Sequence, residues 1–111
     1  NLLARNELQW PFLANLVQLN ESEFRKFFSG TTIKRLGRNR FIRNVLIAMG
    51  NSKKREVIPL VKEKLDDKSP LVRAMAIWAL AQLLDPKIFN KVRENNFAAE
   101  QDLAVKAEWS F

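Results

Sequence analysis

The spacing of apolar residues predicts helices along almost the whole chain. Apolar side chains recur three and four residues apart, as in Val57, Ile58, Val61 and Leu65. The sequence has neither a sustained apolar-polar alternation nor an Asn-Gly or Asp-Gly turn, which are the usual signals of strands and hairpins. We therefore predict an all-α chain, with helices at residues 2–19 (which Pro11 could break), 21–28, 40–49, 54–65, 70–84, 86–95 and 103–111.

Short polar residues mark the start of several of these helices. Ser69 precedes Pro70 and Asp85 precedes Pro86, and both pairs are typical of an N-cap followed by proline at the first helical position. The run from Asn20 to Glu23 resembles a capping box, in which the Glu23 side chain reaches back to the amide of Asn20.

An internal repeat then indicates how the helices assemble. Residues 41–47 align with 71–77 and then with 104–107, at offsets of 30 and 33 residues. Each copy has an expected capping residue just upstream (Asn39, Ser69 and Asp102) and one basic residue on an otherwise apolar helix. Such a period predicts a helical solenoid that resembles HEAT-type repeats, with 70–84 as an inner helix buried nearly all round and 54–65 as an outer helix.

Composition excludes several kinds of chemistry. None of the 111 residues is Cys, His or Tyr, so zinc and iron-sulfur sites of the usual ligand types, disulfides and Ser-His nucleophile pairs are excluded. The pair Asp66-Asp67 has no companion ligand, and we interpret it as a capping turn. The longest apolar run, 74–81, is far shorter than a membrane helix requires, so we expect a cytoplasmic protein with no membrane partner.

Positive charge is concentrated in one third of the chain. Lys and Arg total 19 against 12 Asp and Glu, and ten of the basic residues but no acidic residue lie between Phe24 and Arg55. The remainder therefore has 19 − 10 = 9 basic against 12 acidic residues. Such a block attracts polyanions, which makes nucleic acid the first expected partner, although charge blocks also serve solubility alone.

Two clusters in this block are the candidate binding residues. The loop 31–40 leads into a helix whose residues Arg40, Arg43 and Asn44 share one face, and a second cluster opens the helix at 54–65. We expect the two clusters to form one continuous stripe that binds phosphates through Lys34, Arg35, Arg38, Arg40, Arg43, Lys53, Lys54 and Arg55. Arg43 could instead be structural, as we expect of Arg73, with Asp66 or Asp67 as the partner of Arg73.

Two stretches carry a resemblance to a known family. They are Phe24-x-x-x-Phe28-x-Gly30-Thr31-x-Ile33-Lys34-Arg35-Leu36-Gly37-Arg38-x-Arg40-Phe41-x-Arg43-Asn44 and Asp67-x-Ser69-Pro70-Leu71-Val72-Arg73-Ala74. Together they resemble the carboxy-terminal HEAT-like part of epoxyqueuosine reductases. The resemblance implies a parent oxidoreductase that acts on the anticodon loop of certain transfer RNAs in queuosine synthesis, with cobalamin and two [4Fe-4S] clusters.

The resemblance also implies that the catalytic site lies in other domains of the parent protein. The clusters need Cys, which this chain lacks, so the catalytic acid, cobalamin site and cluster ligands would lie upstream, and the chain would not be catalytic alone. Residues 1–20 would be a leading helix or linker from the cluster-binding domain, and 21–111 the HEAT-like domain. Expected partners are tRNA, around the anticodon stem-loop, and the upstream domains of the same parent chain.

Two other interpretations stay open at this point. The chain could be a protein–protein interaction solenoid whose basic stripe docks an acidic partner. Alternatively, the motif at 34–44 could pack on the cluster domain and close the catalytic cleft.

Overall fold

The computed structural model describes residues 10–110, and every regular element among them is helical. The all-α prediction is confirmed, while the part of the first expected helix before residue 10 lies outside the described residues. The elements are α1 (Trp10–Val17), α2 (Glu21–Phe27), η1 (Thr32–Leu36), α3 (Arg38–Ser52), η2 (Arg55–Val57), α4 (Ile58–Glu63), η3 (Lys64–Asp66), α5 (Pro70–Leu83), α6 (Pro86–Asn96) and α7 (Leu103–Glu108).

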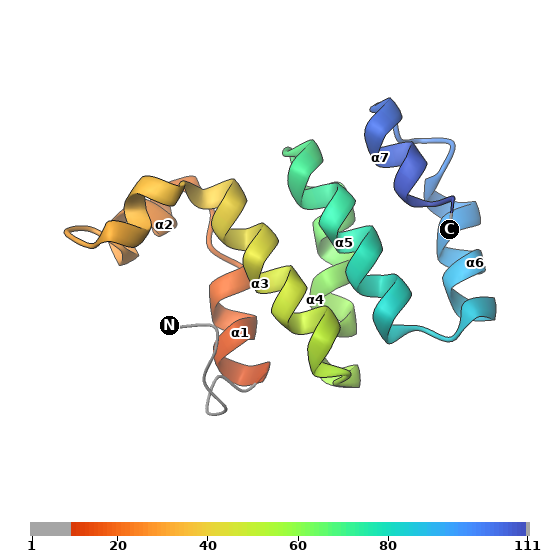
Figure 1. Cartoon of the computed structure of the whole chain (residues 1–111), viewed down its shortest axis with the longest axis horizontal. Coiled ribbons are helices and arrows are strands. Elements are labelled where there is room, and N and C mark those ends of the chain that lie inside the picture. The colour runs from red at the N-terminus through yellow and green to blue at the C-terminus, as the bar shows by residue number, and fades with distance from the viewer. Residues whose placement is uncertain (1–9, 111) are drawn as a thin grey trace.

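The longer helices stack as pairs into an elongated body of 42 × 29 × 17 Å. In Figure 1, α3, α5 and α7 lie side by side, and α1, α4 and α6 stand beside them as their partners. The most extensive contact joins α3 to α5, and α5 also contacts α4, α6 and α7. This is the stacked arrangement of a helical solenoid, in which each pair buries its apolar face against the next pair.

One hydrophobic core runs through the stack. Helix α3 contributes Ile42, Val45, Leu46 and Met49, and α5 contributes residues that include Val72, Ala76, Ala79 and Leu80. Helix α1 joins the same core through Leu13, Leu16 and Val17, so the core continues across residue 20, where we expected the leading helix or linker to end. Helix α5 is less enclosed than expected, because Ala74, Met75 and Trp78 are half-buried and Leu71 is exposed.

Most of the expected caps are present. Asn20 accepts a hydrogen bond from the amide of Glu23 at 2.8 Å, and the Glu23 carboxylate accepts one from the amide of Asn20 at 2.9 Å, which completes the capping box. Ser69, Asp85 and Asp102 cap α5, α6 and α7. The expected cap at Asn39 is wrong: Asn39 lies inside α3, whose N-cap is Gly37 without a side-chain hydrogen bond.

The expected helix at 54–65 is broken into three short pieces. Pro59 stands in the first turn of α4, and because proline has no N–H it cannot continue a helix that began earlier. The residues before it close a 3-10 turn instead, in which the amide of Val57 donates to the carbonyl of Lys54 at 3.3 Å. A second 3-10 turn, η3, leads to Asp67 and positions the loop before α5.

Gly50 provides a test of how closely α3 and α5 pack. A β-carbon at Gly50 would lie 2.7 Å from Cζ3 of Trp78 and 3.1 Å from Cα of Ala79. We expect Gly50→Ala to destabilise the chain by about 1–2 kcal/mol, because overpacking outweighs the better helix propensity of alanine. Chemical denaturation measures this, with the exposed neighbour Asn51→Ala as control; a stabilised Gly50→Ala chain would show that the two helices are not in close contact.

Candidate nucleic-acid interface

The segment at residues 21–40, which we call the basic arm, projects from one end of the stack (Figure 1). Three aromatic rings join it to α3: the rings of Phe24 in α2 and of Phe28, the C-cap of α2, lie 5.4 and 4.8 Å from the ring of Phe41, centroid to centroid. Phe24 and Phe28 also contact each other at 5.1 Å, and all three rings are buried. This small aromatic core positions the arm.

The arm carries several exposed cations. Lys34 and Arg35 lie on η1 and Arg40 lies in the first turn of α3, and all three side chains are exposed. Between them the chain turns at Gly37, whose φ of 88° is readily adopted only by glycine. Arg25 and Lys26 add two exposed cations at the end of α2, of which Arg25 lies 3.5 Å from the carboxylate of Glu21. The arm therefore gathers solvent-exposed positive charges of the kind that contact phosphates.

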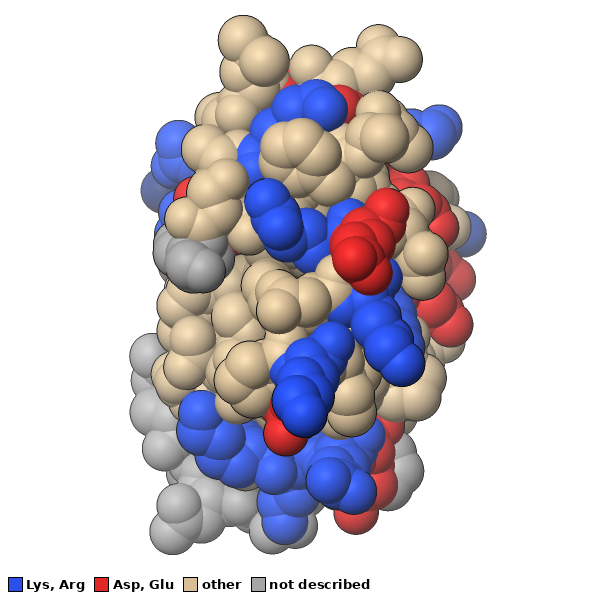
Figure 2. All heavy atoms as spheres, turned by 90° about the vertical axis from the view of Figure 1, so that its right-hand side faces the viewer, with Lys and Arg blue, Asp and Glu red and all other residues tan. Residues whose placement is uncertain are grey.

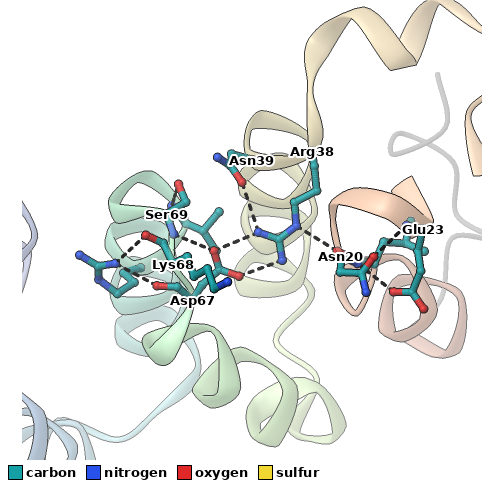
Figure 3. A network of polar contacts seen from close by, with 10 residues as sticks. Asn20, Glu23, Arg38, Asn39, Asp67, Lys68 and Ser69 are labelled. Carbon is teal, nitrogen blue, oxygen red and sulfur yellow. Dashed lines mark hydrogen bonds and ion pairs between the residues drawn. The ribbon is translucent and has the colours of Figure 1, made fainter. Parts of the chain in front are cut away.

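Arg38 has a different role from its neighbours, as Figure 3 shows. Its guanidinium donates to both carboxylate oxygens of Asp67, at 2.9 and 2.8 Å, and its Nε donates to the carbonyl of Leu19 at 2.9 Å. The two side chains of this ion pair are only 11% and 8% exposed. The expectation that Arg38 contacts RNA is therefore corrected: its donors hold the turn after α1 and the loop before α5 against α3.

The environment of Asp67 stabilises its charged form. Burial would raise the pKa of this carboxyl, but hydrogen bonds from Arg38 and from the amide of Ser69, together with the charge of Arg38, hold the pKa below its ordinary value. The amide of Ser69 donates to Asp67 at 3.0 Å, and the Ser69 hydroxyl in turn caps α5. The ion pair thus fixes the N-terminus of the next inner helix.

A second pair repeats this arrangement one step further along the stack. Arg73 donates to both oxygens of Glu100, at 2.9 and 3.0 Å, and to the carbonyls of Asp67 and Lys68. Burial opposes the charge of Glu100, yet the Arg73 hydrogen bonds and the amide of Asp102 lower its pKa. The structural role expected of Arg73 is present, but its carboxylate partner is Glu100 and not Asp66 or Asp67.

Arg43 differs from the arm's exposed cations in its burial. It is half-buried in a groove of about 370 Å³ between α3, α5 and α7, lined also by Ile47, Leu71, Ala74, Met75, Trp78 and Glu108. One guanidinium nitrogen donates to Asn44 at 3.3 Å, while its buried Nε has no hydrogen-bond partner among the residues described.

The second basic cluster does not continue the first. Lys53, Lys54 and Arg55 follow the C-terminus of α3, whereas Lys34 and Arg35 precede its N-terminus. The 15 residues of α3 separate the two clusters by about 20 Å. The expected continuous stripe is therefore wrong, because both clusters flank one helix at its opposite ends. Lys53 is also partly engaged, since its ammonium donates to the carbonyl of Gln82 at 3.2 Å.

The opposite end of the molecule has a mixed surface. Figure 2 faces the end formed by α6 and α7, where basic and acidic side chains are interspersed among neutral ones. Within residues 10–110, no group of three or more Asp or Glu side chains is placed to hold a metal ion. No helix in the same range is long and apolar enough to cross a membrane. With no Cys or His, the chain offers no usual ligands for the iron-sulfur clusters implied by the resemblance.

One sequence signal could have revealed the two ion pairs. Asp67 precedes the cap Ser69 by two residues, and Glu100 precedes the cap Asp102 by two residues. The same motif, an acidic residue two positions before a helix cap, thus occurs twice at an offset of 33 residues. Because equivalent residues of a solenoid occupy equivalent places, the two carboxylates mark the two joints between repeats.

Arg38 and Arg40 form a matched pair for testing which cations are structural. We expect Arg38→Ala to lower the free energy of unfolding by about 3 kcal/mol, because it leaves the Asp67 carboxylate buried without a partner. The exposed Arg40→Ala should change it by less than about 0.5 kcal/mol. Urea denaturation of both variants measures the difference, and equal effects would contradict the assignment of Arg38 as a structural residue.

The lowered pKa values of Asp67 and Glu100 predict loss of stability in acid. A carboxyl whose folded pKa lies below its unfolded pKa stabilises the fold above the unfolded pKa and loses that contribution as pH falls through the folded pKa. We therefore expect the free energy of unfolding to fall steeply below about pH 4. Asp67→Asn should be less stable at pH 7 but lose less on acidification, and an unchanged acid response in that variant would contradict this account.

Comparisons with known proteins agree with the fold. A family model described as HEAT repeats matches residues 36–108. Epoxyqueuosine reductase of Xanthomonas campestris is 38% identical over 80 residues, covering 71% of this chain and 22% of that protein. The enzyme of Escherichia coli is 33% identical over 81 residues, covering 73% and 21%. A Geobacillus stearothermophilus protein named for the gldA 3′ region is 30% identical over 103 residues, covering 92% and 47%.

Solved structures give the same result. Epoxyqueuosine reductase from Bacillus subtilis matches with a TM-score of 0.80 and 25% identity, over 88% of this chain and 26% of that one. A structure of an epoxyqueuosine reductase with an epoxyqueuosine-modified tRNA-Tyr stem loop matches equally well. The chain spans about a fifth of the length of the reductases it matches in sequence. Since the HEAT model covers most of its residues and its helix pairs stack as that model implies, the chain belongs to the HEAT-repeat family.

Proposed function

We propose that this chain is the HEAT-like, tRNA-binding scaffold of an epoxyqueuosine reductase-like enzyme of queuosine modification. The proposal has two parts: the basic arm holds the phosphate backbone of a tRNA anticodon stem-loop, and the chain itself performs no chemistry on the base. The likeness to part of the reductases supports the first part, as does the stem loop present in one of the matching structures.

The observation that carries the proposal is the set of exposed cations on the arm. Lys34, Arg35 and Arg40 are solvent-exposed and lie within a stretch of sequence that has no Asp or Glu between residues 24 and 55. A cation that has no carboxylate beside it keeps its positive potential and gains free energy when it replaces counterions condensed on a nucleic acid. Arginine adds bidentate hydrogen bonds to phosphate oxygens, and lysine adds a point charge.

The cluster at Lys53, Lys54 and Arg55 is proposed as a second, separate phosphate contact. Because it lies about 20 Å from the arm across α3, it would touch a different part of an extended ligand. A folded RNA offers phosphates along its whole backbone, so two separated contacts would fix its orientation as well as its position.

The reaction itself would belong to other parts of such an enzyme. Cobalamin and two [4Fe-4S] clusters, which the resemblance implies for the parent, would supply the reductive chemistry when bound there. This chain has no Cys for cluster ligation, and its contribution is to position the RNA. We assign it no catalytic residue.

A second candidate function is contact with a protein surface. The groove beside Arg43 favours it, because its walls are largely apolar and the buried Nε of Arg43 has no partner among the described residues. A carboxylate from the remainder of the enzyme, or from another protein, could pair with the half-buried Arg43 side chain that lines this groove.

A salt series tests the RNA proposal. We expect the chain to bind an anticodon stem-loop RNA and to lose affinity steeply between about 50 and 200 mM salt. The triple variant Lys34→Ala, Arg35→Ala, Arg40→Ala should reduce the slope of log affinity against log salt by about two to three, because each neutralised phosphate contributes about 0.7 to 0.9. Fluorescence anisotropy with labelled RNA measures both quantities.

The matched control removes the same charge elsewhere. Lys62, Lys87 and Lys91 are exposed on α4 and α6, and their triple replacement by Ala changes the net charge equally, from +7 to 7 − 3 = +4. If both triple variants lose affinity equally, binding depends on net charge alone and the arm is not the site. If the unmodified chain shows no RNA binding at low salt, the RNA function is overturned.

A further inference from the structure

Phe27 is an aromatic side chain that is not part of the hydrophobic core. Its neighbours Phe24 and Phe28 are 1% and 4% exposed and pack on Phe41, whereas Phe27 is 59% exposed. It contacts Phe28 edge-on, with ring centroids 4.9 Å apart and planes at 86°. The Phe28 contact supports the ring from one side and leaves most of its surface to solvent.

The surroundings of Phe27 carry the charge of the basic arm. Arg25 and Lys26 precede it in the last turns of α2. Directly after Phe28 the chain reverses in a turn, closed by the amide and the hydroxyl of Thr31, which both donate to the carbonyl of Phe28, at 3.0 and 2.8 Å. The turn leads into η1 with Lys34 and Arg35, so Phe27 and these cations belong to the same segment of chain, which projects from the stack (Figure 1).

An exposed aromatic ring among cations matches the chemistry of an unpaired nucleotide. The cations attract the phosphates, and the ring offers a flat apolar surface on which a base can stack. The core of a protein–protein interface, by contrast, is depleted in lysine, and a ring that follows Lys26 on an arm that also carries Lys34 fits that description poorly. The charge and the ring therefore favour RNA over a protein as the occupant.

We propose that Phe27 is a stacking platform for an unpaired base of the RNA held by the basic arm. This inference rests on the proposed function and adds to it a preference for single-stranded or loop RNA over duplex. The cations alone contact backbone and do not distinguish the two, because a paired duplex carries the same phosphates. The ring distinguishes them, because only an unstacked base has a free face.

The test compares Phe27→Ala and Phe27→Leu in the whole chain. Stacking on one aromatic side chain contributes about 1–3 kcal/mol, so we expect Phe27→Ala to weaken binding of a stem-loop RNA by about 5- to 150-fold. Phe27→Leu, which keeps an apolar side chain but has no ring, should lose most of that affinity as well. Affinity for a fully paired duplex of the same length should stay within about twofold, and the salt slope should not change, because phenylalanine neutralises no phosphate.

A fluorescent base gives a second readout. With 2-aminopurine at each loop position in turn, one position should be quenched by the unmodified chain and not by Phe27→Ala. Because the ring is mostly exposed, thermal unfolding of the variant should match that of the unmodified chain. Unchanged loop affinity, or an equal loss on duplex, overturns the stacking role.

The two levels of the proposal fail in different ways. If the arm's triple variant loses RNA while Phe27→Ala does not, the RNA function stands and the stacking platform is wrong, which leaves the ring for a protein contact. If the unmodified chain binds neither loop nor duplex RNA at low salt, both the RNA function and the stacking role are overturned.

Discussion

The bidentate ion pairs between successive repeats are the constraint on which the rest of this structure depends. Arg38 holds Asp67 and Arg73 holds Glu100, and each carboxylate also accepts from the amide of the next helix cap, Ser69 or Asp102. Each pair therefore sets the distance between neighbouring repeats and the start of the following inner helix at once. In the third repeat, Lys106 lies 33 residues after Arg73 and donates to the carbonyl of Phe97 at 3.0 Å. Like Arg73, it thus binds a backbone carbonyl in the segment before its own helix.

These pairs also decide which cations remain available for a ligand. A guanidinium with both edges engaged and little exposure has few donors left for a phosphate, so Arg38 and Arg73 belong to the scaffold. Lys34, Arg35 and Arg40 make no such contact among the described residues and stay in solvent. The positive charge of the sequence is thus divided between holding the stack together and facing outward, and Arg38 belongs to the first group although it lies between Arg35 and Arg40 in the sequence.

Local signals were enough to predict much of the fold. Asn20, Ser69, Asp85 and Asp102 cap helices through hydrogen bonds to amides two or three residues away, so their role can be read from the sequence alone. The structural role of Arg38 could not be predicted from the sequence, because its partner Asp67 lies 29 residues further along the chain and is brought near by the stacking of α3 on α5. The exposure of Phe27 could not be predicted either, because it depends on which rings of this segment pack against Phe41.

The placement of the carboxylates explains why the basic arm keeps its positive potential. Asp67 and Glu100 are held at the joints between repeats, and Asp85 and Asp102 at helix caps, all outside the arm. Glu21 and Glu23 belong to the arm itself and occupy the first turn of α2, where Glu23 is engaged in the capping box and Glu21 lies 3.5 Å from Nε of Arg25. These two acids therefore offset part of the positive charge of α2 itself. Lys34, Arg35 and Arg40 lie beyond the turn that follows α2, in a stretch without any acidic residue, so their potential is offset least. Close contacts between these cations and a bound phosphate are also screened less by salt than interactions over longer distances.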